Sequence, residues 1–209
     1  MSKMKVFNTE PPEYGKDYGR GWIGFNHAGS WFSSAIAHVQ RWDKKEDIDI
    51  SHVLIVSGED ECIEAAYPKG VVRTGLTEGY WDKTDRYVVF RQPKDLTEDI
   101  ADQLIETAER ELGNKFDYSS VANMAVQKNF VGWMINKMFF NKPAELADKL
   151  NTDDDEWVCS SLAAYCMAQI DQYEDAELLQ RPPGVISPQE LFEADGLFEP
   201  FPDDDEVDE

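Results

Sequence analysis

Cysteine is rare in this sequence, with three residues in 209. Cys62, Cys159 and Cys166 form an odd-numbered set without the regular spacing of a disulfide framework. This absence excludes the small disulfide-rich secreted folds and favours a reducing compartment. The sequence also contains no Cys-x-x-Cys or His-x-x-x-His pair, so it lacks the usual ligand spacing of a structural zinc site.

Long apolar runs are missing as well. No segment approaches the roughly 20 consecutive apolar residues that span a bilayer, and residues 1–10 contain lysines but no apolar core of a secretory signal. We therefore expect a chain without a transmembrane segment that is cytoplasmic as synthesised. Association with a virion or another large particle, or release by lysis, would leave no mark on the sequence.

Basic residues are scarce relative to acidic ones. The sequence has 20 Lys and Arg against 42 Asp and Glu, and the formal net charge is −22. A negative field of this size repels phosphate backbones and anionic lipids, so nucleic-acid binding is not expected. The same field favours cationic or neutral substrates over anionic ones. Part of the charge lies in residues 199–209, which we predict to be a disordered acidic tail.

What the chain does contain is enough apolar sequence for one packed core. Hydrophobic residues make up 42% of the 209 positions, which suits a single domain and is short for two. Residues 1–20 are polar and without a clear period, and we predict an N-terminal arm there. Residues 21–198 are predicted to form the domain.

The hydrophobic pattern separates strands from helices along the chain. Strand patterns occupy residues 21–25, 50–58, 62–66, 71–74 and 86–91. Helical spacing occupies residues 30–42, 95–112 and 126–140, the segment that begins at Cys159, and a short segment after Ser187. Because the strands cluster in one part of the chain, with helices before and after them, we predict an α+β fold with an antiparallel sheet.

The position of Cys159 is chemically suggestive. Acidic residues 153–156 and Trp157 lead into it, and small and apolar residues then follow at helical spacing. A helix start presents unpaired N–H groups and a partial positive charge, which favour thiolate over thiol. Cys159 is therefore a candidate nucleophile. On this stretch alone the ordinary alternative, a small buried core residue, stays open, and for Cys166 a core position is what we expect.

A thiol nucleophile needs a base within hydrogen-bond reach and a third group that orients the base. His27 falls in a predicted loop and His38 in a predicted helix, whereas His52 lies in an apolar strand, where its ring needs a specific partner. Glu64 is a carboxylate in another apolar strand. If the two strands pair, both side chains can share one face of the sheet. The alternatives are a histidine bonded to backbone and a charge that protects a sheet edge.

Four short segments that contain these residues follow one another in a distinctive order: Ile50-Ser51-His52-Val53-Leu54-Ile55-Val56, Cys62-Ile63-Glu64-Ala65-Ala66, Gly70-Val71-Val72 and Trp157-Val158-Cys159-Ser160-Ser161-Leu162. The order resembles that of the circularly permuted NlpC/P60 (YiiX-like) papain-fold hydrolases, in which the histidine strand precedes the cysteine helix. Residues 21–25, 113–118 and 186–191 also resemble landmarks of that family. The resemblance spans roughly residues 20–193.

This resemblance implies a papain-like fold, an antiparallel sheet or small barrel packed against helices. It also implies Cys159 as nucleophile, His52 as general base and acid, and Glu64 as the residue that orients His52. The implied reaction is hydrolysis of an amide bond, in a peptide or a peptidoglycan stem peptide, through a thioester and without a cofactor or metal. The backbone N–H of Cys159 is the expected first donor to the oxyanion.

The sequence departs from the family at Phe116, where relatives more often have a tyrosine after the glycine. Tyr118 or Tyr67 could supply the missing hydroxyl. Together with Ser51, these residues are the candidates for substrate binding.

Residues 121–150 look longer than the fold requires, and we predict a helical insertion or lid there. Within it, residues 126–140 carry an aromatic face that suits a protein partner. The ordinary alternative is that this face packs on the core.

Three other functions stay open at this point. A lipid thioesterase or acyltransferase of the lecithin retinol acyltransferase-like type has a permuted layout too, so a lipid-derived acyl substrate is the first alternative. The second is a binding or particle-associated protein that has lost turnover, against which the intact set of Cys159, His52 and Glu64 argues. The third, a structural metal site from the same three residues, lacks the usual ligand spacing.

Overall fold

The structure of the chain is a computed structural model. It describes residues 4–7, 10–28, 48–66, 68–81, 86–116 and 156–201. The helices expected at residues 30–42 and 126–140, the predicted insertion at 121–150, and the acidic tail from residue 202 onward lie outside these described residues.

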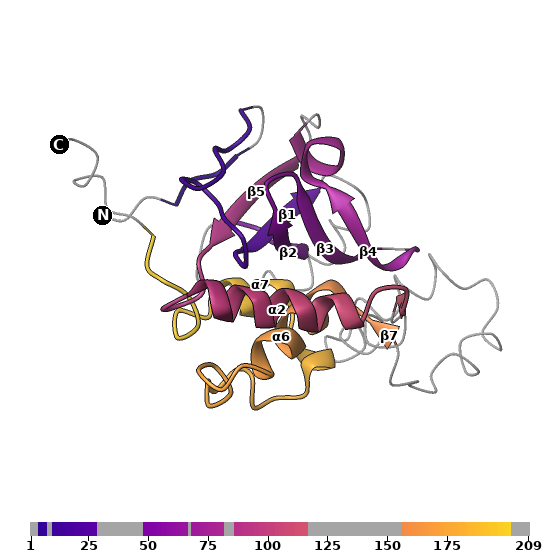
Figure 1. Ribbon diagram of the computed structural model, residues 1–209, viewed down its shortest axis with the longest axis vertical. Helices are drawn as coiled ribbons and strands as arrows, with labels where there is room; N and C mark the ends of the chain where they lie inside the picture. Colours follow the sequence, from indigo (N-terminus) through magenta and orange to yellow (C-terminus); the bar gives the residue numbers. More distant parts are fainter. Residues whose placement is uncertain are drawn as a thin grey trace.

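A five-stranded sheet forms the centre of the described fold (Figure 1). Its strands are β1 (Ile23–Ala28), β2 (His52–Gly58), β3 (Glu61–Ala66), β4 (Gly70–Gly75) and β5 (Arg86–Arg91). They are ordered β4-β3-β2-β1-β5, and every neighbouring pair is antiparallel. This confirms the predicted α+β class and antiparallel sheet. The five strands form an open sheet with β4 and β5 at its edges, so the alternative of a small barrel is not realised in them.

Both faces of the sheet are covered, which explains the nearly continuous apolar run in β2. Val53 and Ile55 belong to the core on the helical side of the sheet. Leu54 and Val56 belong to a second cluster on the opposite face. The alternation of side chains along a strand thus divides β2 between two cores.

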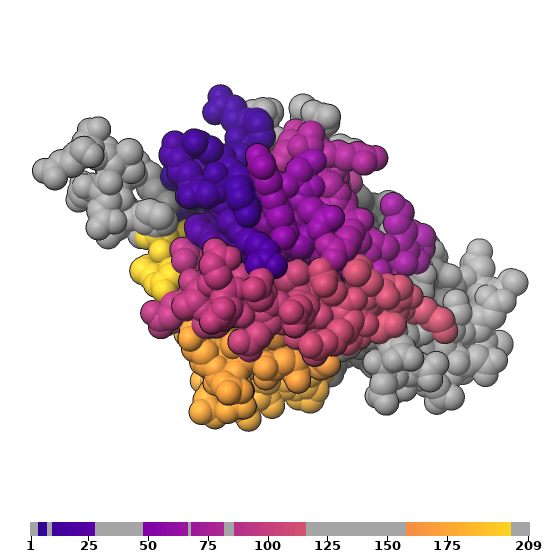
Figure 2. Space-filling view, in the orientation of Figure 1, coloured from indigo at the N-terminus to yellow at the C-terminus, as the bar shows by residue number. Residues whose placement is uncertain are grey.

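In the described part of the chain, three helices cover one face of the sheet: α2 (Glu98–Arg110), α6 (Cys159–Ala168) and α7 (Pro188–Phe192). Thr97 caps α2, and its hydroxyl accepts a hydrogen bond from the backbone N–H of Ile100. Figure 2 shows α2 as a band across the molecule, between the strands and the carboxyl-terminal part. This position shields α6, in which all residues except Tyr165 and Ala168 are buried.

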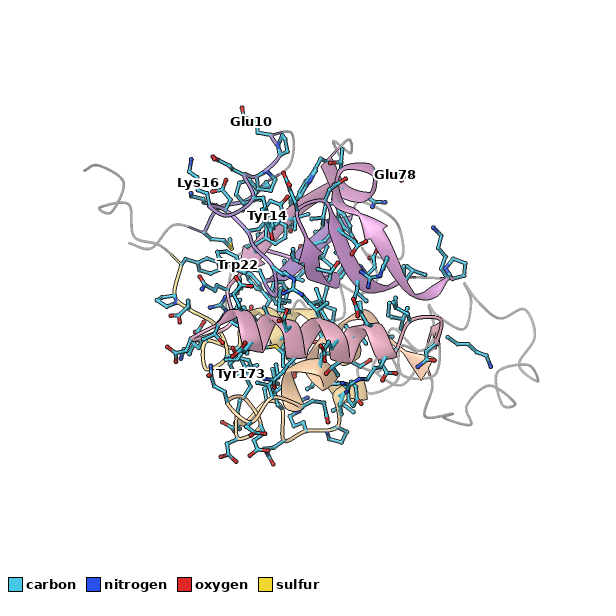
Figure 3. All side chains as sticks on the ribbon, in the orientation of Figure 1. Glu10, Tyr14, Lys16, Trp22, Glu78 and Tyr173 are labelled. Carbon is cyan, nitrogen blue, oxygen red and sulfur yellow. The ribbon has the colours of Figure 1, made fainter. Side chains whose placement is uncertain are left out.

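Short elements complete the carboxyl-terminal part. A 3-10 turn, η2 (Pro183–Val185), precedes α7. Ser187 caps α7 in a reciprocal arrangement with Glu190, as the Ser-Pro pair predicts. Tyr173, labelled in Figure 3 on the helical side, donates its hydroxyl to the carbonyl of Lys94 at 2.7 Å.

The predicted N-terminal arm packs on the other face of the sheet. Phe7 forms an isolated antiparallel bridge with Val88 of β5, and the ring of Tyr18 stacks on Phe90 with centroids 4.8 Å apart. In Figure 3, Glu10 and Lys16 lie at the outer margin of the arm. The arm therefore closes the second core. A single π-helical turn, η1 (Thr77–Trp81), closes it on the side of β4.

A two-stranded parallel pair, β6 (Lys115–Phe116) and β7 (Glu156–Trp157), lies beside β4. The pairing places the residues that precede and follow 117–155 next to each other, immediately before Cys159. Gly70 makes this packing close: its φ is +83°, and a Cβ there would lie 2.0 Å from the carbonyl oxygen of Asn114. Glycine is therefore required where β4 meets the turn before β6.

Within the described ranges, no helix combines the length and the apolarity needed to cross a membrane.

Candidate active site

Cys159 is the first residue of α6 and is 8% exposed. Ser161 holds the start of this helix, because its hydroxyl accepts from the N–H of Val158 at 3.0 Å and donates to the carbonyl of Val158 at 2.8 Å. The hydroxyl of Ser160 donates to the carbonyl of Ile186 at 2.7 Å. The sulfur thus lies at a fixed helix start, where the first N–H groups have no partner within the helix.

His52 and Glu64 meet across the β2–β3 hairpin. His52 begins β2, opposite Asn26 of β1, and Glu64 lies within β3, opposite Val72 of β4. Nε2 of His52 contacts Oε2 of Glu64, which realises the pairing that the sequence suggested. The side chain of His52 is 21% exposed and that of Glu64 is 6% exposed. A molecule in solution can therefore reach the histidine, whereas the carboxylate lies behind it.

Cys159 interacts with the same histidine. Burial alone lowers the pKa of His52, but charge and a side-chain hydrogen bond from Cys159, followed by the same two interactions with Glu64, raise the pKa to about 10. The ring therefore keeps its proton at neutral pH. Because Glu64 occupies Nε2, Nδ1 is the nitrogen left to face the sulfur.

Glu64 stays ionised although it is nearly buried. Burial raises its pKa, yet hydrogen bonding and charge from His52, and hydrogen bonds from Thr74 and Tyr80, lower the pKa to about 2. The hydroxyl of Tyr80 donates to Oε2 at 2.6 Å. We did not predict Thr74 or Tyr80 from the sequence. Thr74 lies in β4 opposite Cys62, two positions from Glu64 on the neighbouring strand, so strand alternation could have indicated it. No sequence signal indicates Tyr80.

The other two thiols lie in the core. Burial raises the pKa of Cys62 well above its ordinary value, and burial also raises the pKa of Cys166 strongly. Both side chains are 0% exposed, which confirms the core position expected for Cys166. Among the described residues, Cys159 is thus the thiol that stands beside a histidine.

The predicted substrate-binding residues are described only in part. Ser51 is buried, and its backbone N–H and its hydroxyl both donate to the carbonyl of Asn26, at 3.0 and 3.5 Å. Its hydrogen bonds therefore fix the entry to β2. Phe116 belongs to β6 by its backbone, but its side chain lies outside the described part, as do Tyr67 and Tyr118.

The side chains of Cys159, His52 and Glu64 also include atoms of the kinds that bind metal ions. In the part of the chain that the structure describes, no group of three or more His, Cys, Asp and Glu residues is arranged to hold a metal ion. Oε2 of Glu64, the oxygen nearest to the histidine, already accepts hydrogen bonds from His52 and Tyr80.

Comparisons with known proteins bear on the fold. No family model and no curated protein sequence matches this chain. Among solved structures, the chain is similar to the crystal structure described as the metalloprotein YiiX from Escherichia coli O157:H7, with a TM-score of 0.51 and 20% sequence identity. The match covers 85% of this chain and 93% of that chain. The protein therefore has an α+β fold similar to that of YiiX.

Proposed function

We propose that the protein is a cysteine hydrolase with a circularly permuted papain-like (NlpC/P60) fold, which cleaves an amide bond in a peptide or a peptidoglycan stem peptide. Cys159 is the nucleophile, His52 the general base and acid, and Glu64 the orienting residue. One observation carries this proposal: His52 interacts with Cys159 at a helix start on one side and with the nearly buried Glu64 on the other. The similarity to YiiX, whose family the sequence motifs resemble, supports it.

The first half-reaction is acylation of the sulfur. The proton of the Cys159 thiol passes to His52, and Glu64 stabilises the imidazolium. The thiolate attacks the substrate carbonyl carbon, and the negative charge that develops on oxygen is stabilised by the backbone N–H of Cys159. When the carbon–nitrogen bond breaks, the leaving amine takes the proton from His52. The products of this step are a free amine and a thioester on Cys159.

The second half-reaction is hydrolysis of the thioester. His52 is now neutral and removes a proton from a water molecule as that water attacks the thioester carbon. Collapse of the tetrahedral intermediate breaks the carbon–sulfur bond and releases the carboxylic acid. The thiolate and the imidazolium are then restored. Throughout both steps Glu64 remains ionised, as its lowered pKa requires.

The first test of this function is the rate of alkylation of Cys159 by iodoacetamide between pH 5 and 9. We expect wild-type Cys159 to react well below pH 7 and His52→Ala to lose at least about tenfold of the rate, because the imidazolium stabilises the thiolate. Mass spectrometry locates the modified residue. Cys62 and Cys166, both buried, serve as internal references that stay unmodified in the native protein.

A matched control is His27→Ala, which removes a histidine that stacks on Tyr87 in the same sheet. This variant should keep the alkylation profile of the wild type. If Cys159 is inert in the wild type, or equally reactive with and without His52, the catalytic proposal fails and the protein should be studied as a binding module. If the profile is as expected, matched peptide amides and acyl esters offered as substrates separate amide hydrolysis from the lipid-directed alternative.

A further inference from the structure

The turn η1 is attached by hydrogen bonds to two separate parts of the sheet. At its start, the backbone N–H of Thr77 donates to Oδ1 of Asp60 at 2.7 Å, in the turn between β2 and β3. Near its end, Arg86 of β5 donates to the carbonyl of Gly79 at 3.1 Å. Turns of this π type are rare and occur frequently at functional sites. The two attachments join the turn to the β2–β3 connection and to β5.

The residue that η1 presents to the sheet is Tyr80. Its side chain is buried in the second core, and its hydroxyl donates to Oε2 of Glu64. The same oxygen contacts Nε2 of His52. Tyr80 and His52 therefore hold one carboxylate oxygen from two directions, while Thr74 adds a further hydrogen bond to the carboxylate.

The charged and titratable groups around Tyr80 come from two strands. Glu64 and Cys62 face it from β3, and Arg86 faces it from β5. Burial, followed by the charge of Glu64, raises the pKa of Tyr80 well above its ordinary value. The hydroxyl therefore keeps its proton, and remains a donor, at neutral pH.

We propose that Tyr80 is a positioning residue for the reaction proposed above: its hydroxyl fixes the Glu64 carboxylate in the orientation that turns the His52 ring toward Cys159. This inference rests on the proposed function. The chemical argument is that, without Tyr80, the carboxylate oxygen that contacts His52 would lack its second donor, and the terminal torsion of a glutamate has a broad energy minimum. A second donor on the same oxygen removes that freedom, and the imidazole then has one favoured direction.

The competing explanation is that Tyr80 merely fills space in the second core. The test is therefore Tyr80→Phe, which keeps the ring and removes only the hydroxyl. The matched control is Tyr18→Phe, which removes the hydroxyl of another buried tyrosine in the same cluster. The hydroxyl of Tyr18 donates to the carbonyl of Glu59, so this control does not touch the carboxylate of Glu64. Urea unfolding of both variants shows that each is folded.

Two measurements separate positioning from packing. The first is the alkylation rate of Cys159 at pH 6, which should fall about tenfold in Tyr80→Phe and stay unchanged in Tyr18→Phe, as expected for loss of a hydrogen bond to a charged group. The second is the imidazole nitrogen spectrum of protein labelled with ¹⁵N-histidine. The chain has three histidines, and His52→Ala assigns the signal of His52. In Tyr80→Phe, His52 should lose its proton about one pH unit lower than in the wild type, because the misoriented carboxylate holds the imidazolium less well.

The outcomes are distinct. If both variants behave alike, or if His52 in Tyr80→Phe loses its proton at the same or a higher pH, the hydroxyl does not position the pair and the proposal is overturned. If wild-type Cys159 is inert to iodoacetamide, the proposed hydrolase function fails instead. The nitrogen spectrum then still decides whether Tyr80 orients Glu64 and His52.

Discussion

A carboxylate inside a sheet is stable only when its donors replace the water it has lost. Glu64 has three such donors, namely His52, Thr74 and Tyr80. Because the pKa of Glu64 is lowered from 4.5 to about 2, its contribution to stability is complete above pH 4.5 and is lost as the pH falls through about 2. The pKa of His52 is raised from 6.5 to about 10, so its contribution is complete below pH 6.5 and is lost as the pH rises through about 10.

The His52–Glu64 pair is therefore most stabilising between about pH 4.5 and 6.5. Removing the charge of Glu64 should lower the free energy of unfolding most in that range. We expect Glu64→Gln to lower the free energy of unfolding by about 3 kcal/mol at pH 5.5, the scale of breaking a buried ion pair. The difference should shrink above pH 10. Urea denaturation at both pH values measures it.

Glu61→Gln is the control for this prediction. Glu61 lies in the same strand, but it is paired with Arg73 at the surface, where its side chain is 45% exposed. Its loss should change the free energy of unfolding by less than about 1 kcal/mol at either pH. Equal costs for the two variants would show that the Glu64 pair has no special role in stability.

At the level of the elements, local signals could be read from the sequence and non-local ones could not. Thr97 and the periodic Leu104 and Ala108 indicate a helix at residues 95–112. The observed helix, α2 (Glu98–Arg110), begins and ends within three residues of those bounds. The strand containing His52 follows from its apolar run. Tyr80, by contrast, reaches Glu64 because η1 is held between separate parts of the sheet, and no local pattern encodes that arrangement.

The helix that starts at Cys159 shows the same division. Its start follows from the small and apolar residues after the acidic run, and the structure places the first helical residue at Cys159. The parallel pairing of β6 with β7 just before it was not predicted, because each strand has two residues. A pairing that short leaves no period in the sequence.

The junction of β4 and β6 gives a prediction at this scale. Gly70 and Gly15 both have positive φ, +83° and +81°, but a Cβ at Gly70 would lie 2.0 Å from a backbone oxygen, whereas nothing lies within 4 Å at Gly15. Gly15→Ala should therefore cost only the backbone strain, about 1–2 kcal/mol. Gly70→Ala should cost at least about twice as much, because backbone atoms must also move. Thermal or urea unfolding compares the two, and equal costs would show that the close approach is easily relieved.

The whole molecule carries a formal net charge of −22, and this charge opposes the compact state through self-repulsion. Raising NaCl from 20 to 200 mM should therefore increase the free energy of unfolding at pH 7.5, because the Debye length falls from more than 20 Å to less than 10 Å, roughly. The increase should be smaller near pH 4.5, where many carboxylates are protonated. A stability that is independent of salt at pH 7.5 would show that the charges are too dispersed to repel one another appreciably.

The pairing of β6 with β7 has a consequence for how this chain can vary. The residues that flank 117–155 lie at neighbouring backbone positions, so the number of residues between them is not set by a distance that must be spanned. For a flexible segment that joins two neighbouring positions, the entropic cost of closure grows only logarithmically, by about 0.6 kcal/mol for each doubling in length. Insertions and deletions between β6 and β7 should therefore change the stability of the fold little, although they fall immediately before the helix of Cys159. Related chains can be expected to differ most in length there, with the scaffold around Cys159 and His52 left in place.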